Sequence, residues 1–138
     1  MSGKAKRVVA RASVTNDPKP YGVRIDTAGH LLRSDEPVSS GGGDTGPAPF
    51  GLLLAGLGAC TSITLRMYAE HKDWPLEGVD VHLKYVVQDK LRWIDRAITV
   101  HGELDDHQRA RLGEIADKTP VTKALRAGTD IRTTIDTG

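Results

Sequence analysis

The stretch from Pro49 to Lys72 constrains the fold more than any other part of the chain, because no polar residue occurs between Phe50 and Ala59. At helical spacing, apolar or small residues fall on every face of this segment, which is typical of a helix buried in protein. Pro49 suits the first turn of a helix, where its missing N–H costs nothing, and the first charged residue is Arg66. The sequence therefore predicts a buried central helix whose last turns reach solvent.

This helix is not predicted to cross a membrane. Its strictly apolar part is about half of the roughly 20 residues that a span requires, and Thr61, Ser62 and Thr64 follow it. A single chain of 138 residues can surround such a helix only with difficulty. We therefore expect a partner subunit to cover one side of it.

The composition indicates a soluble protein with a single domain, 1–138, in which residues 1–6 form a flexible N-terminus. Hydrophobic residues make up 38% and charged residues 27% of the chain, which is ordinary for a globular protein. The net charge of +1 and the few aromatic residues (three Tyr, two Trp, one Phe) argue against nucleic acid or an anionic membrane as a partner. The basic start is not followed by the apolar region of a signal peptide, so we expect a cytoplasmic protein.

The single cysteine and the histidines limit the possible chemistry further. One cysteine, Cys60, excludes an intrachain disulfide framework and fits a reducing compartment. The five histidines lack the paired spacing of metal ligands. We therefore predict no metal site and no cofactor.

Alternating apolar residues predict two groups of antiparallel strands. The first group lies at 7–14, 21–26 and 30–34, with turns at Asn16 to Pro20 and at Ala28-Gly29, and would form a meander. The second is a hairpin of residues 79–88 and 91–101, with Ile94, Ile98 and Val100 facing inward.

Capping residues predict two helices after this hairpin. Asp105 and Gln108 have the spacing of a capping box. Thr119-Pro120 has the chemistry of an N-cap followed by the first helical residue, and a last strand is expected at 129–136. Hairpins rather than βαβ units place the chain in the α+β class.

The glycine-rich loop 35–49, DEPVSSGGGDTGPAP, leads into the central helix. Glycine-rich loops can bind phosphate, but this one lacks the Lys-Ser/Thr ending of a P-loop and does not follow a βα crossover. A flexible entry loop is the favoured interpretation.

Several separated motifs, in this order, resemble the OsmC/Ohr family, and most of all its OsmC-like branch. The resemblance covers roughly residues 20–136 and is carried by DEP (35–37), GGGDTGPAP (41–49), LLLAGLGACT (52–61), TLRMYAE (64–70), WPLE (74–77) and ADKTPV (116–121). It implies an intertwined α+β homodimer with antiparallel sheets around the central helices. It also implies a peroxidatic cysteine on the central helix, a resolving cysteine in a later Cys-Pro pair, and an Arg and a Glu that shape the first thiolate.

Only part of the family's catalytic pattern is present in this chain. Cys60 stands at the position of the peroxidatic cysteine, whereas Thr119 stands at that of the resolving cysteine. Phe50 and Gly51 occupy the stretch where the family has its Glu. The basic residues near the expected position of the family's Arg are Lys19, Arg24 and Arg33.

The resemblance and the missing residues leave two main functions open. In the first, Cys60 is the peroxidatic cysteine of a peroxidase for organic hydroperoxides, and an external thiol reduces it because Thr119 has no thiol. In the second, Cys60 is an inert, small apolar residue. The chain then binds a small apolar ligand at the dimer interface, where Gly51 and Thr119 leave the pocket apolar. A purely structural or interaction role is a third possibility.

Overall fold

The computed structural model describes residues 5–18 and 20–138 of the chain. Most of the predicted flexible terminus, 1–6, therefore lies outside the described residues, and so does Lys19. The chain divides into two compact units, one up to Leu53 and one from Leu54. Each unit is built from antiparallel strands and helices, which confirms the predicted α+β class.

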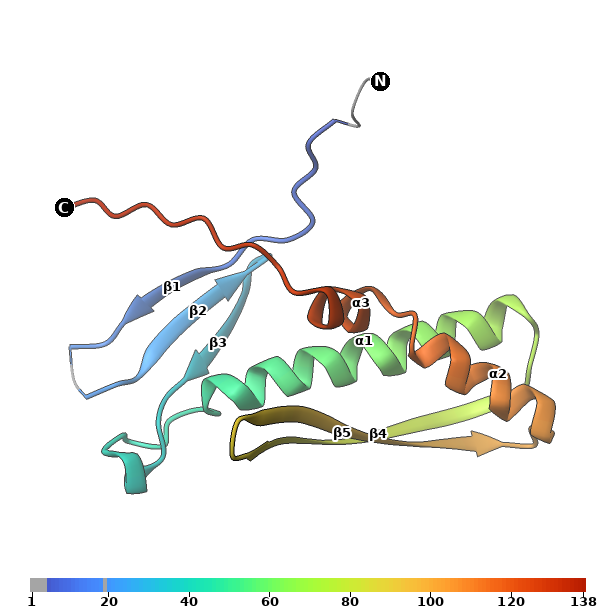
Figure 1. Cartoon of the computed structure of the whole chain (residues 1–138). Helices are drawn as coiled ribbons and strands as arrows, with labels where there is room; N and C mark the ends of the chain where they lie inside the picture. Colours follow the sequence, from blue (N-terminus) through green and yellow to red (C-terminus); the bar gives the residue numbers. More distant parts are fainter. Residues whose placement is uncertain (1–4, 19) are drawn as a thin grey trace. The chain divides into compact units, whose positions relative to one another are not determined.

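The first unit contains an antiparallel sheet with strand order β1-β2-β3, as Figure 1 shows. Its strands are β1 (Ser13–Asn16), β2 (Val23–Thr27) and β3 (His30–Ser34). The predicted turn at Ala28-Gly29 joins β2 to β3, and both of its residues have positive φ. The meander is thus confirmed.

The first strand is shorter than the sequence predicts. A strand at 7–14 was expected, but β1 begins only at Ser13, which pairs with Asp26 of β2. One residue later, β2 ends and the chain turns. The preceding residues 5–12 therefore have no neighbouring backbone to pair with among the described residues, although their composition suits a strand.

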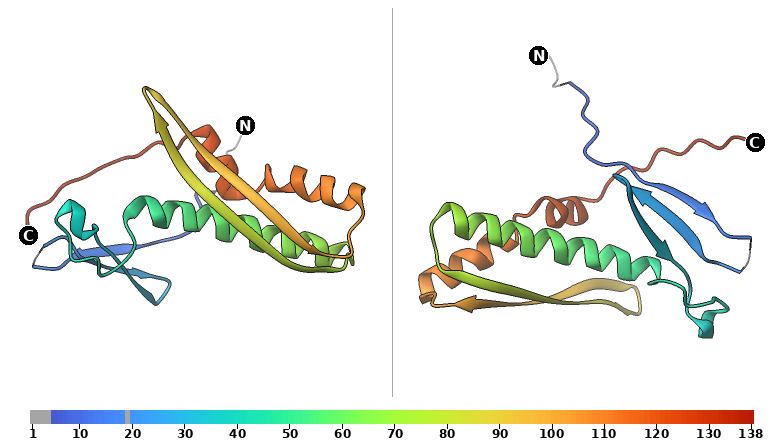
Figure 2. Two further views of the ribbon diagram at one scale, coloured as in Figure 1. Left: turned by 90° about the horizontal axis from the view of Figure 1, so that it is seen from below. Right: turned by 180° about the vertical axis from the view of Figure 1, so that it is seen from behind.

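The second unit holds most of α1 (Pro49–His71), the hairpin of β4 (Leu76–Gln88) and β5 (Leu91–Gly102), and the helices α2 (Asp106–Ala116) and α3 (Pro120–Ala127). The hairpin crosses α1 at an angle, and α2 and α3 lie beside α1 (Figures 1 and 2). The predicted hairpin is confirmed, and Asp89-Lys90 forms the two-residue turn between its strands.

The ends of α2 and α3 follow the predicted capping chemistry. Asp105 accepts a hydrogen bond from the Gln108 backbone, and the Gln108 side chain accepts one from the Asp105 backbone. Thr119 caps α3, with Pro120 as its first residue. The predicted last strand at 129–136 is wrong for the single chain, because these residues find no strand to pair with in the described part of the chain.

The core of the second unit lies between α1, α2 and the hairpin. Leu65 on α1 and Leu112 on α2 are fully buried at its centre. Burial of one such leucine stabilises the fold by about 1.5–3 kcal/mol. The core also contains Ala69, Leu76, Leu104 and Ala116, with Tyr68, Trp74, Val79, Ile98, Val100 and Ile115 packed against it.

Within the single chain, α1 is buried on one face only. Its buried residues, Leu57, Thr61, Leu65 and Ala69, recur every four positions. On other faces Ile63 is 53% and Met67 64% exposed, so the predicted burial on every side is not found in this chain. The helix is also long and apolar enough to cross a membrane. This is weak evidence, because the core helix of a soluble protein meets the same criterion.

Candidate functional site

The glycine-rich loop of the first unit is organised around the carboxylate of Asp35. This residue is only 3% exposed. Its carboxylate accepts hydrogen bonds from the Thr45 hydroxyl (2.6 Å), the Thr45 backbone N–H (3.2 Å) and the Glu36 backbone N–H (2.7 Å). A Cβ on Gly42 would lie 2.0 Å from the Glu36 carbonyl oxygen, so only glycine fits there. The loop therefore surrounds an anion of its own, which argues against a phosphate at this place.

The hydrogen bonds from Thr45, and further backbone bonds from Glu36 and Gly43, hold the pKa of Asp35 below its ordinary value of 3.8, although burial opposes this shift. The stability that this carboxylate contributes is therefore complete above pH 3.8 and is lost as the pH falls through the lower folded pKa.

We expect Asp35→Asn to be less stable than the wild type at neutral pH, with the difference in stability between the two narrowing below about pH 4. Thermal unfolding from pH 7 to 3 measures this, and a constant difference would contradict it.

The candidate cations Arg24 and Arg33 lie opposite each other on β2 and β3. The Arg33 guanidinium donates to Asp17 (2.5 Å) and to Thr45 (3.2 Å), and the Asp17 contact raises the pKa of Arg33. Both arginines line a hollow of about 580 Å³ on the sheet of the first unit, together with Ser13, Thr15, Ile25, Asp26, Leu31 and Leu32. Arg33 is thus already committed to partners within its own unit.

Cys60 belongs to the second unit and lies in the middle of α1, more than two turns from its first residue. It is partly buried, and its Sγ is 3.9 Å from the Thr64 hydroxyl. The helix dipole stabilises negative charge mainly within the first turn, so it would contribute little to stabilising a thiolate at this position. Cys60 as a residue therefore keeps some exposed surface in the single chain.

Directly beside Cys60 in the sequence, Thr61 contacts a largely covered cation that the sequence analysis missed. Arg96 of β5 donates to the Thr61 hydroxyl at 3.0 Å, although its side chain is only 12% exposed. Arg96 has the same parity on β5 as the inward-facing Ile94 and Ile98, and its partner on β4 is Leu83. A charged residue in phase with an apolar strand face is a signal that could have identified it.

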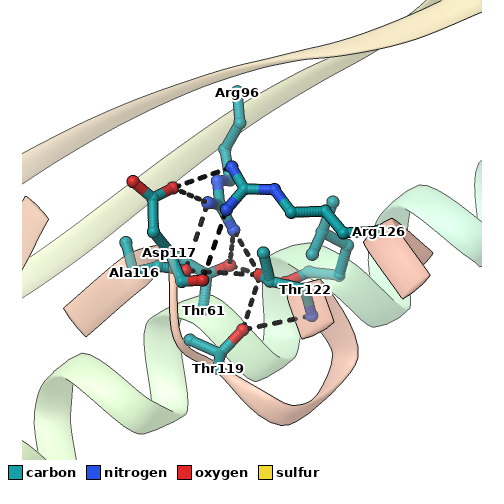
Figure 3. Close-up of polar contacts among 8 residues, drawn as sticks. Thr61, Arg96, Ala116, Asp117, Thr119, Thr122 and Arg126 are labelled. Carbon is teal, nitrogen blue, oxygen red and sulfur yellow. Dashed lines mark hydrogen bonds and ion pairs between the residues drawn. The ribbon is translucent and has the colours of Figure 1, made fainter. Parts of the chain in front are cut away.

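The guanidinium of Arg96 joins three helices of the second unit, as Figure 3 shows. Besides Thr61 on α1, it donates to the Ala116 carbonyl at the end of α2 (3.1 Å) and to the Thr122 hydroxyl on α3 (2.9 Å). It also contacts the Asp117 carboxylate (3.3 Å), which Arg126 shares. The Ala116 carbonyl lies at the C-terminal end of α2, which carries partial negative charge, and Asp117 adds the charge of its carboxylate. Both therefore offset the cost of removing this cation from water.

Thr119 completes the same network. It is fully buried, and its hydroxyl lies 2.6 Å from that of Thr122 while also accepting from the Thr122 backbone (Figure 3). Thr122 in turn donates to the Ala116 carbonyl. The residue at the family's second-cysteine position is therefore a structural hydroxyl with its hydrogen bonds made.

Gly51, at the position where the family has its Glu, lies in the first turn of α1. A Cβ added there would contact the Pro47 side chain at 3.8 Å. No group of three or more His, Cys, Asp or Glu side chains that could hold a metal ion occurs among the described residues. The chemistry available around Cys60 is therefore that of one thiol, neighbouring hydroxyls and a buried guanidinium.

Comparison with known structures shows the same fold in several proteins. An OsmC-like protein from Mycoplasma pneumoniae is 17% identical, with a TM-score of 0.69 over 89% of each chain. The organic hydroperoxide resistance protein OsmC of Legionella pneumophila is 19% identical (TM-score 0.64, 89% of this chain, 92% of that one). OhrB of Bacillus subtilis, also an organic hydroperoxide resistance protein, is 20% identical (TM-score 0.61, 89% and 94%).

Sequence comparison points in the same direction. No curated protein sequence matches the chain. The sequence profile of the OsmC-like proteins, however, matches residues 41–134, which include α1, the hairpin, α2 and α3. This match covers most of the chain and includes Cys60 and Thr119. The chain therefore belongs to the OsmC/Ohr family of OsmC-like proteins.

Proposed function

We propose that this protein is a thiol-dependent peroxidase for organic hydroperoxides, with Cys60 as its peroxidatic cysteine. The observation that carries the proposal is the partial exposure of Cys60 in the middle of α1, in a family whose members include organic hydroperoxide resistance proteins. A buried, sealed sulfur would have favoured an inert residue instead.

The reaction needs one cysteine and an external reductant. The Cys60 thiolate attacks the distal oxygen of the hydroperoxide, the O–O bond breaks, and the alkoxide takes a proton and leaves as an alcohol. Cys60 is then a sulfenic acid. A small thiol attacks its sulfur, releasing water and leaving a mixed disulfide, and a second thiol restores Cys60 and leaves as part of a disulfide.

Thr119 is the reason why the reductant must come from outside. Its hydroxyl cannot attack a sulfenic acid to form a disulfide, and it is held in the network of Arg96 and Thr122. A reducing cytoplasm, which is the proposed location, supplies small thiols of the required kind.

We further propose that the active form is a homodimer. The exposed side chains of Ile63 and Met67 on α1 support a second copy as the partner. The two-stranded sheet β4-β5 does so too, because no other strand pairs with its edges among the residues that the structure describes. Long unpaired edges invite pairing with another chain. Sedimentation equilibrium measures the mass in solution, and a monomer at micromolar concentration would contradict this part of the proposal.

The test of the proposed chemistry is chemical trapping of the sulfenic acid. The reduced protein receives one equivalent of cumene hydroperoxide in the presence of dimedone, and its intact mass is measured beside that of Cys60→Ser. We expect one dimedone adduct on the wild type and none on the variant. An unmodified wild type, at a dose that oxidises a control thiol peroxidase, would rule the chemistry out.

The alternative function is binding of a small apolar ligand at the dimer interface without catalysis. Gly51 and Thr119 favour it, because they stand where the family has a Glu and a thiol and so reduce the polar groups available to a pocket. Native mass spectrometry of freshly purified protein would detect a retained ligand. A ligand-bound dimer without a dimedone adduct would select this function over the peroxidase.

A further inference from the structure

The apolar pattern of α1 does not by itself single out one face for the core, although Leu65 and Ala69 are the residues buried there. Apolar or small residues occur on all of its faces around Cys60, including Gly56, Gly58, Ala59 and Ile63. A helix with one apolar stripe has one preferred face toward the core, whereas the pattern of α1 leaves that choice to specific contacts. The packing of Leu65 and Ala69 is one of these. A directional contact beside Cys60 would fix more closely which way its sulfur points.

The hydrogen bond between Arg96 and Thr61 is such a contact, because Thr61 is the residue after Cys60 and is fully buried. The Thr61 hydroxyl is itself oriented, since it donates to the Leu57 carbonyl at 2.8 Å. Arg66 and Tyr68 make further hydrogen bonds from α1, to the Leu76 and Glu77 carbonyls and to Arg111, but both lie beyond the turn that holds Cys60.

The position of Arg96 is itself fixed, by acceptors that do not belong to α1. The Ala116 carbonyl, the Thr122 hydroxyl and the Asp117 carboxylate hold the guanidinium from α2 and α3. An apolar side chain could fill the same place, and burying a charge is poor evidence for a gain in stability. The best-attested use of a buried polar contact is to fix register.

We propose that Arg96 is the positioning residue of the Cys60 site: it fixes the rotation of α1 through Thr61 and so directs the Cys60 sulfur. This inference rests on the proposed function, because direction matters only for a sulfur that reacts. An attack on an O–O bond requires the sulfur in line with that bond, and a displacement of about 1 Å can cost roughly 10²-fold in rate.

The test compares four variants: Thr61→Val and Arg96→Met, which remove the contact, Arg96→Lys, which keeps a cation and fewer donors, and Arg66→Met as the matched control. Arg66→Met also removes an α1 guanidinium bound to two carbonyls, but away from Cys60. Two rates are measured for each: Cys60 oxidation by cumene hydroperoxide and Cys60 alkylation by iodoacetamide. Urea unfolding of the same variants gives their stabilities.

We expect Thr61→Val and Arg96→Met to lower the oxidation rate constant at least about tenfold, and Arg66→Met less than about threefold. Arg96→Lys should lie between them. The loss of rate should not follow the loss of stability across the four variants. Thr61→Val is nearly isosteric, so it keeps the test valid if Arg96→Met does not fold.

Two outcomes separate this inference from the proposed function. If wild-type Cys60 reacts with iodoacetamide but not with the hydroperoxide, the peroxidase fails, and the alkylation rates still decide whether Thr61 and Arg96 direct the sulfur. If both rates in Thr61→Val and Arg96→Met equal those in Arg66→Met, the positioning role is overturned. A wild-type Cys60 that is inert to both reagents would overturn the peroxidase and the positioning role together.

Discussion

Replacement of Cys60 by serine is expected to lower thiol-dependent hydroperoxide turnover by roughly 10³-fold or more, because the reaction then has no nucleophilic sulfur. Serine fills nearly the same volume, so the packing of α1 is preserved. The measurement is the steady-state consumption of cumene hydroperoxide with a small dithiol as reductant. In the wild type the rate should rise with the thiol concentration, since each cycle consumes external thiol.

The matched control is Thr64→Val, which removes the hydroxyl 3.9 Å from the Cys60 sulfur. A contact of this length is weak, so we expect less than about a tenfold change in rate. Equal activity in Cys60→Ser and the wild type would assign the turnover to something other than this cysteine. A rate independent of thiol would contradict the single-cysteine cycle.

Leu65→Ala is expected to lower the free energy of unfolding by about 2–5 kcal/mol. Leu65 is fully buried where α1 meets the core of the second unit. The lost methyl groups forfeit their transfer free energy and leave a cavity that the surrounding helices and strands fill only in part. Such a loss is a large fraction of the stability of an ordinary domain.

Urea unfolding at a fixed protein concentration measures this change, with Leu91→Ala as the control. Leu91 is 64% exposed at the start of β5, and we expect its truncation to change the free energy within about 0.5 kcal/mol. If Leu65→Ala cost no more than Leu91→Ala, the packing of α1 against the core would be refuted.

The parts of the fold that depend on local chemistry were predictable from sequence. The caps of α2 and α3 at Asp105 and Thr119 act on backbone groups within a few residues. The central helix and the β4-β5 hairpin follow from apolar periodicity. The strand expected at 7–14 is found only from Ser13 on, and the one expected at 129–136 is absent among the described residues. A strand depends on the neighbour it pairs with, which its own composition does not specify.

The candidate site was predictable only in part, for a similar reason. Family motifs located Cys60 and Thr119, but Arg96 is 36 positions after Cys60 in the sequence and joins Thr61 only through the fold. The cations expected from the resemblance lie before the central helix, and one of them, Arg33, is bound to Asp17. The one sequence signal for Arg96 is that it alternates in phase with Ile94 and Ile98 on β5. This signal becomes informative once the inward face of β5 is known.

The pairing of strands only with their neighbours in sequence has a consequence for how quickly the chain folds. In the described part of the chain, β1, β2 and β3 pair in order, and β4 pairs with β5 across a two-residue turn. Contacts between residues close in sequence need little loop closure, and topologies rich in them fold fast. Each unit can thus begin to form as soon as it leaves the ribosome, without waiting for the rest of the chain.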